Sequence, residues 1–304
     1  MEYKYLGRTK ERISAIGIGT WQLDLNEKAA HEIVCSGVDN GINLIDTAEI
    51  YGTEGIVGKV LDRIGRDDIH VASKVWPNHF HYQDLIDACN GSLKRLGIKQ
   101  IWLYQLHYPN YTVPIEDTMS ALEHLQKEGK IRHIGVSNFS AKELEDAQAA
   151  LNHGEVVSNQ VEYSILMREH EEDGLVDYCK RNNITLIAYS PLGEGQLYER
   201  RNAALLSGLD AIGESHGKTG TQVALNWLIS KKPVVAIPKA SSAKHMAENA
   251  GAATFNLTEG AIGKVDELSK GFSKRPLMGR HVRKLLKHTT FWHGIAARRY
   301  GHDQ

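Results

Sequence analysis

The chain has 304 residues, of which 41% are hydrophobic and 24% are charged, and its formal net charge at pH 7 is −1. This composition is ordinary for a globular protein and excludes an intrinsically disordered chain. The N-terminus lacks the apolar stretch of a signal peptide and no run of eighteen apolar residues occurs, so we expect a cytoplasmic protein with no membrane span.

Charge is unevenly distributed along the chain. Residues 271–304 carry eight Lys or Arg and one acid, which leaves the other residues with a net charge of about −8. We therefore expect a main domain over residues 1–270 followed by a basic C-terminal tail at 271–304. A solvated helix that packs on the acidic domain is the simpler interpretation of this tail, and a nucleic-acid contact is the alternative.

Short apolar runs rich in β-branched residues alternate with helical patterns. The runs predict strands at 14–19, 42–47, 69–75, 101–106, 132–137, 156–161, 184–189 and 234–238. Helix signals separate them; for example, Ser140 and Glu143 have capping-box spacing. Eight strand–helix units predict an α/β fold, a single (β/α)8 TIM barrel, with one further helix at 256–270. A doubly wound sheet competes with it, but it does not explain eight even repeats, and the chain has no Gly-x-Gly-x-x-Gly.

Polar residues follow most of these apolar strands, at the end of a barrel where active sites form. Taken singly, each has an ordinary explanation as a turn, cap or core residue. Those explanations do not account for a whole set of polar residues at one rim of the barrel. The set comprises Asp46, Lys74, His107, Ser137, Asn138, Asn159, Gln160, Tyr189, Ser190 and Lys239.

Four residues near the mouths of neighbouring strands are suited to giving a proton to an oxygen. Tyr51 lies five positions after Asp46, and an unperturbed tyrosine is a weak acid with a pKa of about 10. The Lys74 ammonium would stabilise its phenolate, and Asp46 would hold the ammonium in place. His107, as a neutral donor, would orient a carbonyl oxygen toward Tyr51. A source of hydride is still missing from this set.

These residues lie in motifs that resemble the aldo-keto reductase superfamily, and the resemblance covers residues 5–255. Nine motifs occur in the family's order: GIGTW (17–21), NLIDTAEIYG (43–52), ASKVW (72–76), LYQLHYPN (103–110), IRHIGVSNFS (131–140), NQVEYS (159–164), IAYSPLGEG (187–195), QVALNWLI (222–229) and IPKASSAKHMAENAGA (237–252). The resemblance implies reversible reduction of an aldehyde or ketone, with hydride from a nicotinamide cofactor and a proton from Tyr51. It also implies that Asp46, Lys74 and His107 complete the catalytic tetrad.

The resemblance implies binding roles for further residues. Substrate would meet Trp21, Tyr51, Trp76, His107, Tyr108 and Asn110. The cofactor would meet Gly19, Thr20, Trp21 and Asp46, then Ser137, Asn138 and Gln160 at the carboxamide, Tyr189 at the nicotinamide ring, Ser190, Pro191, Leu192 and Gly193 at the pyrophosphate, and Lys239, Ser241, His245, Glu248 and Asn249 at the adenosine end.

The chain departs from the family's pattern in two places. His245 stands where many members that prefer NADPH have an Arg, and no Arg lies near Ser241, which leaves Lys239 as the main fixed charge for a 2′-phosphate. We therefore expect NADP(H), with NAD(H) or dual use as the alternative. The basic tail also differs from the family's usual closing segment, which bears on substrate specificity.

Other functional classes compete with this interpretation. The resemblance to potassium-channel β-subunits allows a cofactor-sensing binding module with slow or no turnover, but an intact acid cluster favours catalysis. The segment GESHGKTG (213–220) is one residue short of a phosphate-binding loop, and the histidines lack zinc-type spacing, so we expect neither nucleotide hydrolysis nor a metal. The expected partner is a small carbonyl or alcohol substrate rather than a membrane or nucleic acid, and the oligomeric state is left open.

Overall fold

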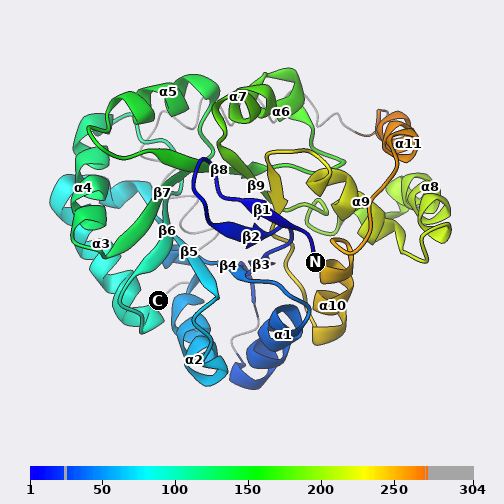
Figure 1. Ribbon diagram of the computed structural model, residues 1–304, viewed down its shortest axis with the longest axis horizontal. Helices are drawn as coiled ribbons and strands as arrows, with labels where there is room; N and C mark the ends of the chain where they lie inside the picture. Colours follow the sequence, from blue (N-terminus) through cyan, green and yellow to red (C-terminus); the bar gives the residue numbers. More distant parts are fainter. Residues whose placement is uncertain (24–25, 271, 273–304) are drawn as a thin grey trace. The chain divides into compact units, whose positions relative to one another are not determined.

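The computed structural model of the chain describes residues 1–23, 26–270 and 272. Figure 1 labels its helices and strands. The first half contains β1 (Tyr3–Tyr5), β2 (Arg12–Ser14), β3 (Ile18–Gly19), α1 (Glu27–Asp39), β4 (Leu44–Asp46), the 3-10 helix η1 (Glu49–Tyr51), α2 (Glu54–Ile64), β5 (His70–Val75), η2 (Pro77–His79), α3 (Tyr82–Leu96), β6 (Ile101–Leu106), α4 (Ile115–Lys127), β7 (Ile131–Ser137) and α5 (Ala141–Ala149). The second half contains β8 (Val156–Glu162), α6 (Glu169–Glu172), α7 (Leu175–Asn182), β9 (Thr185–Tyr189), η3 (Gln196–Tyr198), η4 (Arg200–Asn202), α8 (Ala203–Glu214), α9 (Gly220–Ile229), β10 (Val234–Ala236), α10 (Ala243–Gly251) and α11 (Glu259–Ser269).

The strands β3 to β10 form one sheet whose order follows the chain from β3 to β10. The neighbouring pairs β5–β6, β6–β7, β7–β8 and β9–β10 are parallel. A parallel bridge between Ile16 and Ala236 links the residues just before β3 to the last strand. A sheet in chain order whose first and last strands are bridged, with helices in the connections, is the topology of the predicted (β/α)8 barrel.

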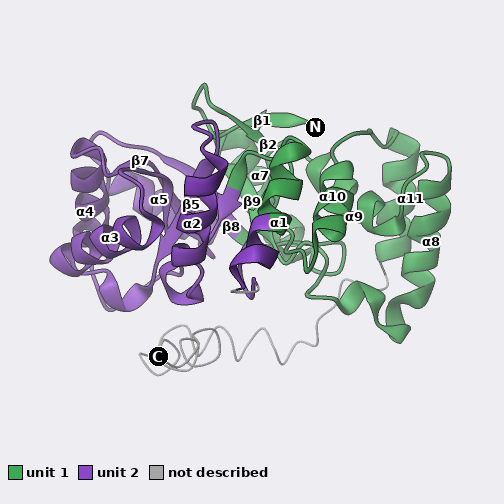
Figure 2. Ribbon diagram, turned by 90° about the horizontal axis from the view of Figure 1, so that it is seen from below, with its two compact units in different colours: residues 1–19, 32–44, 161–275 green, residues 20–31, 45–160, 276–304 purple. Residues whose placement is uncertain are grey.

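The chain divides into two compact units, which Figure 2 shows in different colours. The unit that contains residues 45–160 supplies all four candidate catalytic side chains, those of Asp46, Tyr51, Lys74 and His107. Its strand register places Lys74 beside Gln105 and Ser137 beside Gln160. Because side chains alternate between the two faces of a strand, paired residues such as these point to the same face. The register therefore brings polar side chains from distant parts of the sequence together.

The other unit contains residues 1–19, 32–44 and 161–275, of which 271 and 273–275 lie outside the described residues. Its helix α9 is buried along its whole length, and its N-terminus has a capping box in which Thr219 and Gln222 bond each other's main chain. The helix α10 follows β10, and its N-cap is Ser242, whose side chain accepts a hydrogen bond from the His245 N–H. This unit holds the segments predicted for the adenosine end of a cofactor.

The predicted strands and helices are confirmed in kind, with one difference at the N-terminus. The capping box at Ser140 and Glu143 is present, and the further helix predicted at 256–270 is α11. Residues 14–19 were expected to form one strand, but Ser14 ends β2 of a hairpin and only Ile18–Gly19 join the sheet. The hairpin strand β1 is polar and partly exposed, so it lacks the apolar alternation that predicts strands.

The predicted basic tail lies outside the described residues, apart from Phe272. Within residues 1–23, 26–270 and 272, no helix is long and apolar enough to cross a membrane. The same residues contain no group of three or more His, Cys, Asp or Glu side chains placed to hold a metal ion.

Candidate active site

Asp46 and Lys74 form a buried ion pair at the ends of β4 and β5. Their exposed fractions are 3% and 0%. The Lys74 Nζ donates to Asp46 Oδ1 at 2.6 Å and to the main-chain oxygen of Thr47 at 2.9 Å. Burial lowers the pKa of Lys74, while the negative charges of Asp46 and Glu54 oppose that shift. Asp46 thus compensates a cation that would be costly to bury alone.

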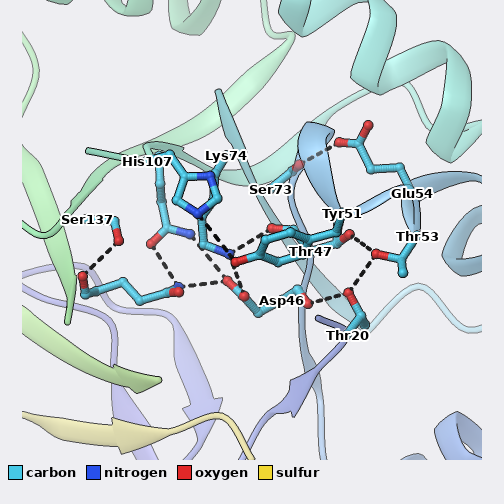
Figure 3. Close-up of polar contacts among 12 residues, drawn as sticks. Thr20, Asp46, Thr47, Tyr51, Thr53, Glu54, Ser73, Lys74, His107 and Ser137 are labelled. Atoms are coloured by element: carbon cyan, nitrogen blue, oxygen red, sulfur yellow. Dashed lines mark hydrogen bonds and ion pairs between the residues drawn. The ribbon is translucent and has the colours of Figure 1, made fainter. Parts of the chain in front are cut away.

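Tyr51 places its hydroxyl between this ammonium and His107 (Figure 3). It closes the 3-10 helix η1, and Gly52 after it has a φ of 70°, a left-handed conformation that favours glycine. The Lys74 Nζ donates to Tyr51 Oη at 3.3 Å, and Tyr51 Oη lies 3.4 Å from His107 Nε2. The phenol is thus in contact with the ammonium and the imidazole together.

His107 follows β6 directly and is 6% exposed. Burial, and then the positive charge of Lys74, hold the pKa of His107 well below its ordinary value, so the imidazole is neutral at neutral pH. Its Nδ1 is buried without a hydrogen-bond partner among the described residues, which leaves Nε2 as the nitrogen that faces Tyr51. The Trp76 ring meets it edge-on at 5.1 Å and the Tyr108 ring stacks on it at 5.5 Å. The site therefore has an apolar, aromatic side.

An amide group lies on the other side of Asp46. Gln160 Nε2 donates to Asp46 Oδ2 at 2.7 Å, and Ser137 Oγ donates to the Gln160 main-chain oxygen at 2.8 Å. Asn138 has a φ of 64°, which asparagine tolerates better than most residues, and its Nδ2 donates to Ser137 Oγ at 3.0 Å. The three residues predicted to hold a carboxamide are thus brought together beside the Asp46 carboxylate.

The residues predicted to bind the cofactor at the end of β3 and in the loop after it are Gly19, Thr20 and Trp21, and they differ in their surroundings. An added Cβ at Gly19 would lie 2.7 Å from the Ile237 main-chain oxygen, so no larger residue fits there. The Thr20 side chain is fully buried, and its Oγ1 donates to the Asp46 main-chain oxygen at 2.9 Å. Trp21 is partly exposed. The Thr20 hydroxyl therefore supports the site from within instead of facing a ligand.

Two residues predicted to contact substrate, Trp76 and Asn110, make hydrogen bonds to neighbouring segments. Trp76 is 3% exposed, and its main-chain N–H donates to the Glu49 carboxylate. Asn110 Nδ2 donates to the Pro77 main-chain oxygen at 2.7 Å, and its Oδ1 accepts from Thr112 N at 2.9 Å. The Asn110 amide thus stabilises the loop after β6, and its predicted contact with substrate stays a prediction.

In the unit that contains residues 161–275, the loop after β9 has an unusual main chain. Tyr189 ends β9, and Ser190, Gly193, Glu194 and Gly195 then all have positive φ angles, between 47° and 87°. Pro191 and Gly193 are buried, and Leu192 is partly exposed. Turns of this kind direct main-chain N–H groups into concavities that bind anions.

The segment after β10 presents polar groups around the start of α10. Lys239 is exposed, and Ser241 Oγ lies 3.0 Å from His245 Nδ1. Glu248 Oε1 accepts a hydrogen bond from Thr219 Oγ1 at 2.8 Å, so this carboxylate serves the packing of α9 and α10. Asn249 is 4% exposed.

Several polar residues that the sequence did not single out support the site. Glu54, on α2, is 1% exposed, accepts from Ser73 Oγ at 2.5 Å and from Arg95 Nε at 2.7 Å. Gln105 is fully buried inside β6, with its Nε2 3.5 Å from Asp46 Oδ2. Thr53 is 1% exposed and contacts two other threonine hydroxyls. A glutamine within an otherwise apolar strand was the one signal that could have revealed Gln105.

Comparisons with known proteins identify the family of the chain. The sequence model of the Aldo/keto reductase family matches residues 15–270. Methylglyoxal reductase YeaE of Escherichia coli (strain K12) is 34% identical over 263 residues, which cover 84% of this chain and 90% of that protein. Glyoxal reductase of Bacillus subtilis (strain 168) is 37% identical over 258 residues, which cover 84% of this chain and 88% of the relative.

Solved structures resemble the chain over most of its length. A thermostable aldo-keto reductase, Tm1743, in complex with the inhibitor epalrestat has a TM-score of 0.82 at 39% identity, with 88% of this chain and 100% of that chain covered. An aldo/keto reductase from Klebsiella pneumoniae in complex with NADP and acetate has a TM-score of 0.79 at 32% identity, with coverage of 88% and 96%. The predicted barrel fold and the predicted enzyme class are thereby confirmed. This chain belongs to the aldo/keto reductase family and is an oxidoreductase that acts on carbonyl groups.

Proposed function

We propose that this protein is an NADP(H)-dependent reductase of small aldehydes and ketones in which Tyr51 gives the proton to the carbonyl oxygen. The observation that carries the proposal is the place of the Tyr51 hydroxyl, 3.3 Å from Lys74 Nζ and 3.4 Å from His107 Nε2. A candidate acid must be within hydrogen-bond reach of the oxygen that it protonates, and its conjugate base must be stabilised. The pair Asp46–Lys74 supplies that stabilisation.

Lys74, Tyr51 and His107 each have a separate role in the proposed proton transfer. Because Lys74 donates a hydrogen bond to Tyr51 Oη, the Tyr51 proton is directed away from the ammonium and is free for the substrate oxygen. When the proton leaves, the ammonium at 3.3 Å stabilises the phenolate that forms. His107 is neutral, so it orients the same carbonyl oxygen without adding a charge. In the reverse direction the phenolate takes the proton of the alcohol.

The residues present fit a nicotinamide dinucleotide. The feature that a bound anionic ligand would explain is the loop at 190–195, where Ser190, Gly193, Glu194 and Gly195 have positive φ angles. When bound, NADPH supplies the hydride that the carbonyl carbon receives. The residues that would hold it are Ser137, Asn138 and Gln160 at the carboxamide, Tyr189 at the ring, Ser190 to Gly193 at the pyrophosphate, and Lys239, Ser241, His245 and Asn249 at the adenosine end.

The relatives suggest which carbonyl compounds to test first. Two of them are named for methylglyoxal and glyoxal, which are small dicarbonyl compounds. The aromatic side of this site, formed by Trp76 and Tyr108 around His107, supports a small substrate whose carbonyl oxygen is its main polar handle. We therefore propose a small reactive dicarbonyl as the substrate class.

The test is steady-state oxidation of NADPH, and in parallel NADH, with methylglyoxal or glyoxal. Tyr51→Phe removes the proposed acid and should lower kcat by about 100-fold to 10,000-fold, while cofactor binding, followed by fluorescence, is retained. Tyr104→Phe is the matched control, because Tyr104 is fully buried on β6 beside Gln105 and points to the opposite face of that strand. It should leave turnover near the wild-type value.

Each outcome distinguishes the proposal from its alternative. Turnover that survives in Tyr51→Phe would remove Tyr51 from the role of acid. Tight cofactor binding by the wild type without turnover of any carbonyl compound would favour the cofactor-sensing module.

A further inference from the structure

Three threonine hydroxyls form a continuous buried chain behind the Tyr51 loop (Figure 3). Thr47 Oγ1 lies 2.8 Å from Thr53 Oγ1, which lies 3.0 Å from Thr20 Oγ1. Thr20 Oγ1 in turn donates to the main-chain oxygen of Asp46 at 2.9 Å. The exposed fractions of the three residues are 0%, 1% and 0% in the order Thr47, Thr53, Thr20. All three contacts have ordinary hydrogen-bond lengths.

The last acceptor in this series of hydroxyls, the Asp46 main-chain oxygen, fixes the direction of all three hydrogen bonds. A hydroxyl has one proton to donate, and the Asp46 main-chain oxygen can only accept, so the proton of Thr20 is used there. Thr20 Oγ1 must then accept the proton of Thr53, and Thr53 Oγ1 must accept the proton of Thr47. The hydroxyl of Thr53 is therefore the only one of the three that receives and donates within the chain of threonines. Bonds in such a series polarise one another and strengthen together.

The hydrogen bond between Thr47 and Thr53 joins the two ends of the segment that contains Tyr51, the proposed acid. Tyr51 lies between Thr47 and Thr53 in the sequence, and their hydroxyls join across it at 2.8 Å. The Thr47 main-chain oxygen accepts from Lys74 Nζ at 2.9 Å, so the same loop is tied to the catalytic ammonium. Thr53 also starts α2, because its main-chain oxygen accepts from Val57 N. Both ends of the segment 47–53 are thus anchored.

We propose that Thr53 is a positioning residue for the reduction: through Thr47 and Thr20 it holds the segment 47–53 so that the Tyr51 hydroxyl stays in contact with Lys74 and His107. This inference rests on the proposed role of Tyr51 as the acid. Thr53 does not touch the reacting atoms and acts only through the loop. Displacement of a reacting group by about 1 Å can cost about 100-fold in rate, so a hydroxyl behind the loop is able to control kcat.

The central test uses two substitutions of Thr53, one that removes its hydroxyl and one that removes its methyl group. Thr53→Val keeps the shape and removes the hydroxyl, and it leaves the Thr47 hydroxyl without its acceptor. Thr53→Ser keeps the hydroxyl and removes only the methyl group. The matched control is Thr118→Val, because Thr118 in the same unit is 1% exposed and donates to the Phe80 main-chain oxygen at 3.0 Å, away from the Tyr51 loop. Thr118→Val costs a comparable buried hydrogen bond.

For Thr53→Val we expect kcat to fall roughly tenfold or more while the KM for NADPH stays within about twofold, because the cofactor residues are unchanged. The pH dependence of kcat should shift, since the contact between Tyr51 and Lys74 is altered. Thr53→Ser should restore kcat and the pH profile, and Thr118→Val should change neither. Amide hydrogen exchange in segment 46–53 should rise in Thr53→Val alone, without any cofactor present.

The outcomes separate this inference from the proposed function. If Tyr51→Phe abolishes turnover but Thr53→Val behaves like Thr118→Val, Thr53 has no positioning role. If Thr53→Ser is as slow as Thr53→Val, the methyl group matters and the hydroxyl chain does not. If Tyr51→Phe retains turnover, the proposed acid is wrong whatever Thr53 does. Should Thr53→Val fail to fold, Thr47→Val removes the first donor of the same chain and gives the same comparison.

Discussion

Burial acts on Lys74 and His107 with different results because only one of them has a counter-charge. Burial lowers the pKa of both side chains. The Asp46 carboxylate at 2.6 Å opposes this shift for Lys74, whereas the charge that acts on the pKa of His107 is the Lys74 ammonium, which adds to the shift. One ammonium therefore stands beside one neutral imidazole, and Tyr51 lies between them. This asymmetry is what lets one group stabilise a phenolate while the other donates to a carbonyl.

A single exposed residue, Lys239, should decide the preference between NADPH and NADH. It is the fixed positive charge that follows β10, and no arginine accompanies it at Ser241 or His245. Lys239→Met should raise the KM for NADPH by roughly tenfold to a hundredfold, as the loss of a hydrogen bond to a charged group implies, and leave the KM for NADH nearly unchanged. Lys244→Met, which removes an exposed lysine of α10, is the control. Equal changes for the two cofactors would exclude Lys239 from the 2′-phosphate contact.

At the scale of elements, α2 is held close to α3 through a glycine. A Cβ added at Gly58 would lie 2.3 Å from the main-chain oxygen of Leu96, the last residue of α3. A Cβ added at Gly55, in the first turn of the same helix, would meet nothing within 4 Å. Because Thr53 is the N-cap of α2, the packing of this helix also bears on where the Tyr51 loop ends.

These two glycines predict opposite effects of the same substitution. Gly58→Ala should destabilise the protein by about 1–3 kcal/mol, because the new methyl group overlaps a main-chain oxygen that cannot move away easily. Gly55→Ala should stabilise it by up to about 1 kcal/mol, since alanine loses less conformational entropy than glycine in a helix. Urea denaturation of the two variants measures both changes. A Gly58→Ala protein as stable as Gly55→Ala would mean that α2 and α3 are not in close contact.

For the whole molecule, the order of elements could be predicted from the sequence, because each strand–helix unit buries its own apolar run. The hairpin strand β1 could not, because it has only three residues and its two tyrosines are exposed, so no alternation of buried apolar residues marks it. Asp46, Lys74 and His107 were found because barrel strands present their C-terminal ends at one rim. Glu54 and Thr53 were missed because their partners, Arg95 and Thr20, lie far away in sequence. Such contacts depend on strand register and side-chain direction, which residue type alone does not encode.

The pH dependence of global stability should carry opposite contributions from two histidines. His107 has a folded-state pKa well below its ordinary value of about 6.5, so below that pH the unfolded chain binds a proton that the folded chain refuses. Its contribution to stability is therefore complete above about pH 6.5 and is lost as the pH falls, by about 1.4 kcal/mol per pH unit. His79 behaves in the reverse way, because its hydrogen bond to Glu49 raises its folded-state pKa. Its contribution is complete below about pH 6.5 and is lost as the pH rises through the folded pKa.

Two substitutions test these signs in one set of urea denaturation curves between pH 5 and 8. His107→Gln should make the loss of stability below pH 6.5 less steep than in the wild type, whatever constant cost the substitution adds, because the proton uptake on unfolding disappears. His79→Gln should remove stability chiefly at the acidic end, where the charged imidazole bonds Glu49, and so should make the loss with falling pH steeper. His79 is partly exposed, so its effect is smaller and weakens as salt is added. A His107→Gln curve parallel to the wild-type curve would show that this imidazole is not held neutral by its surroundings, and the neutral donor of the proposed mechanism would have to be abandoned.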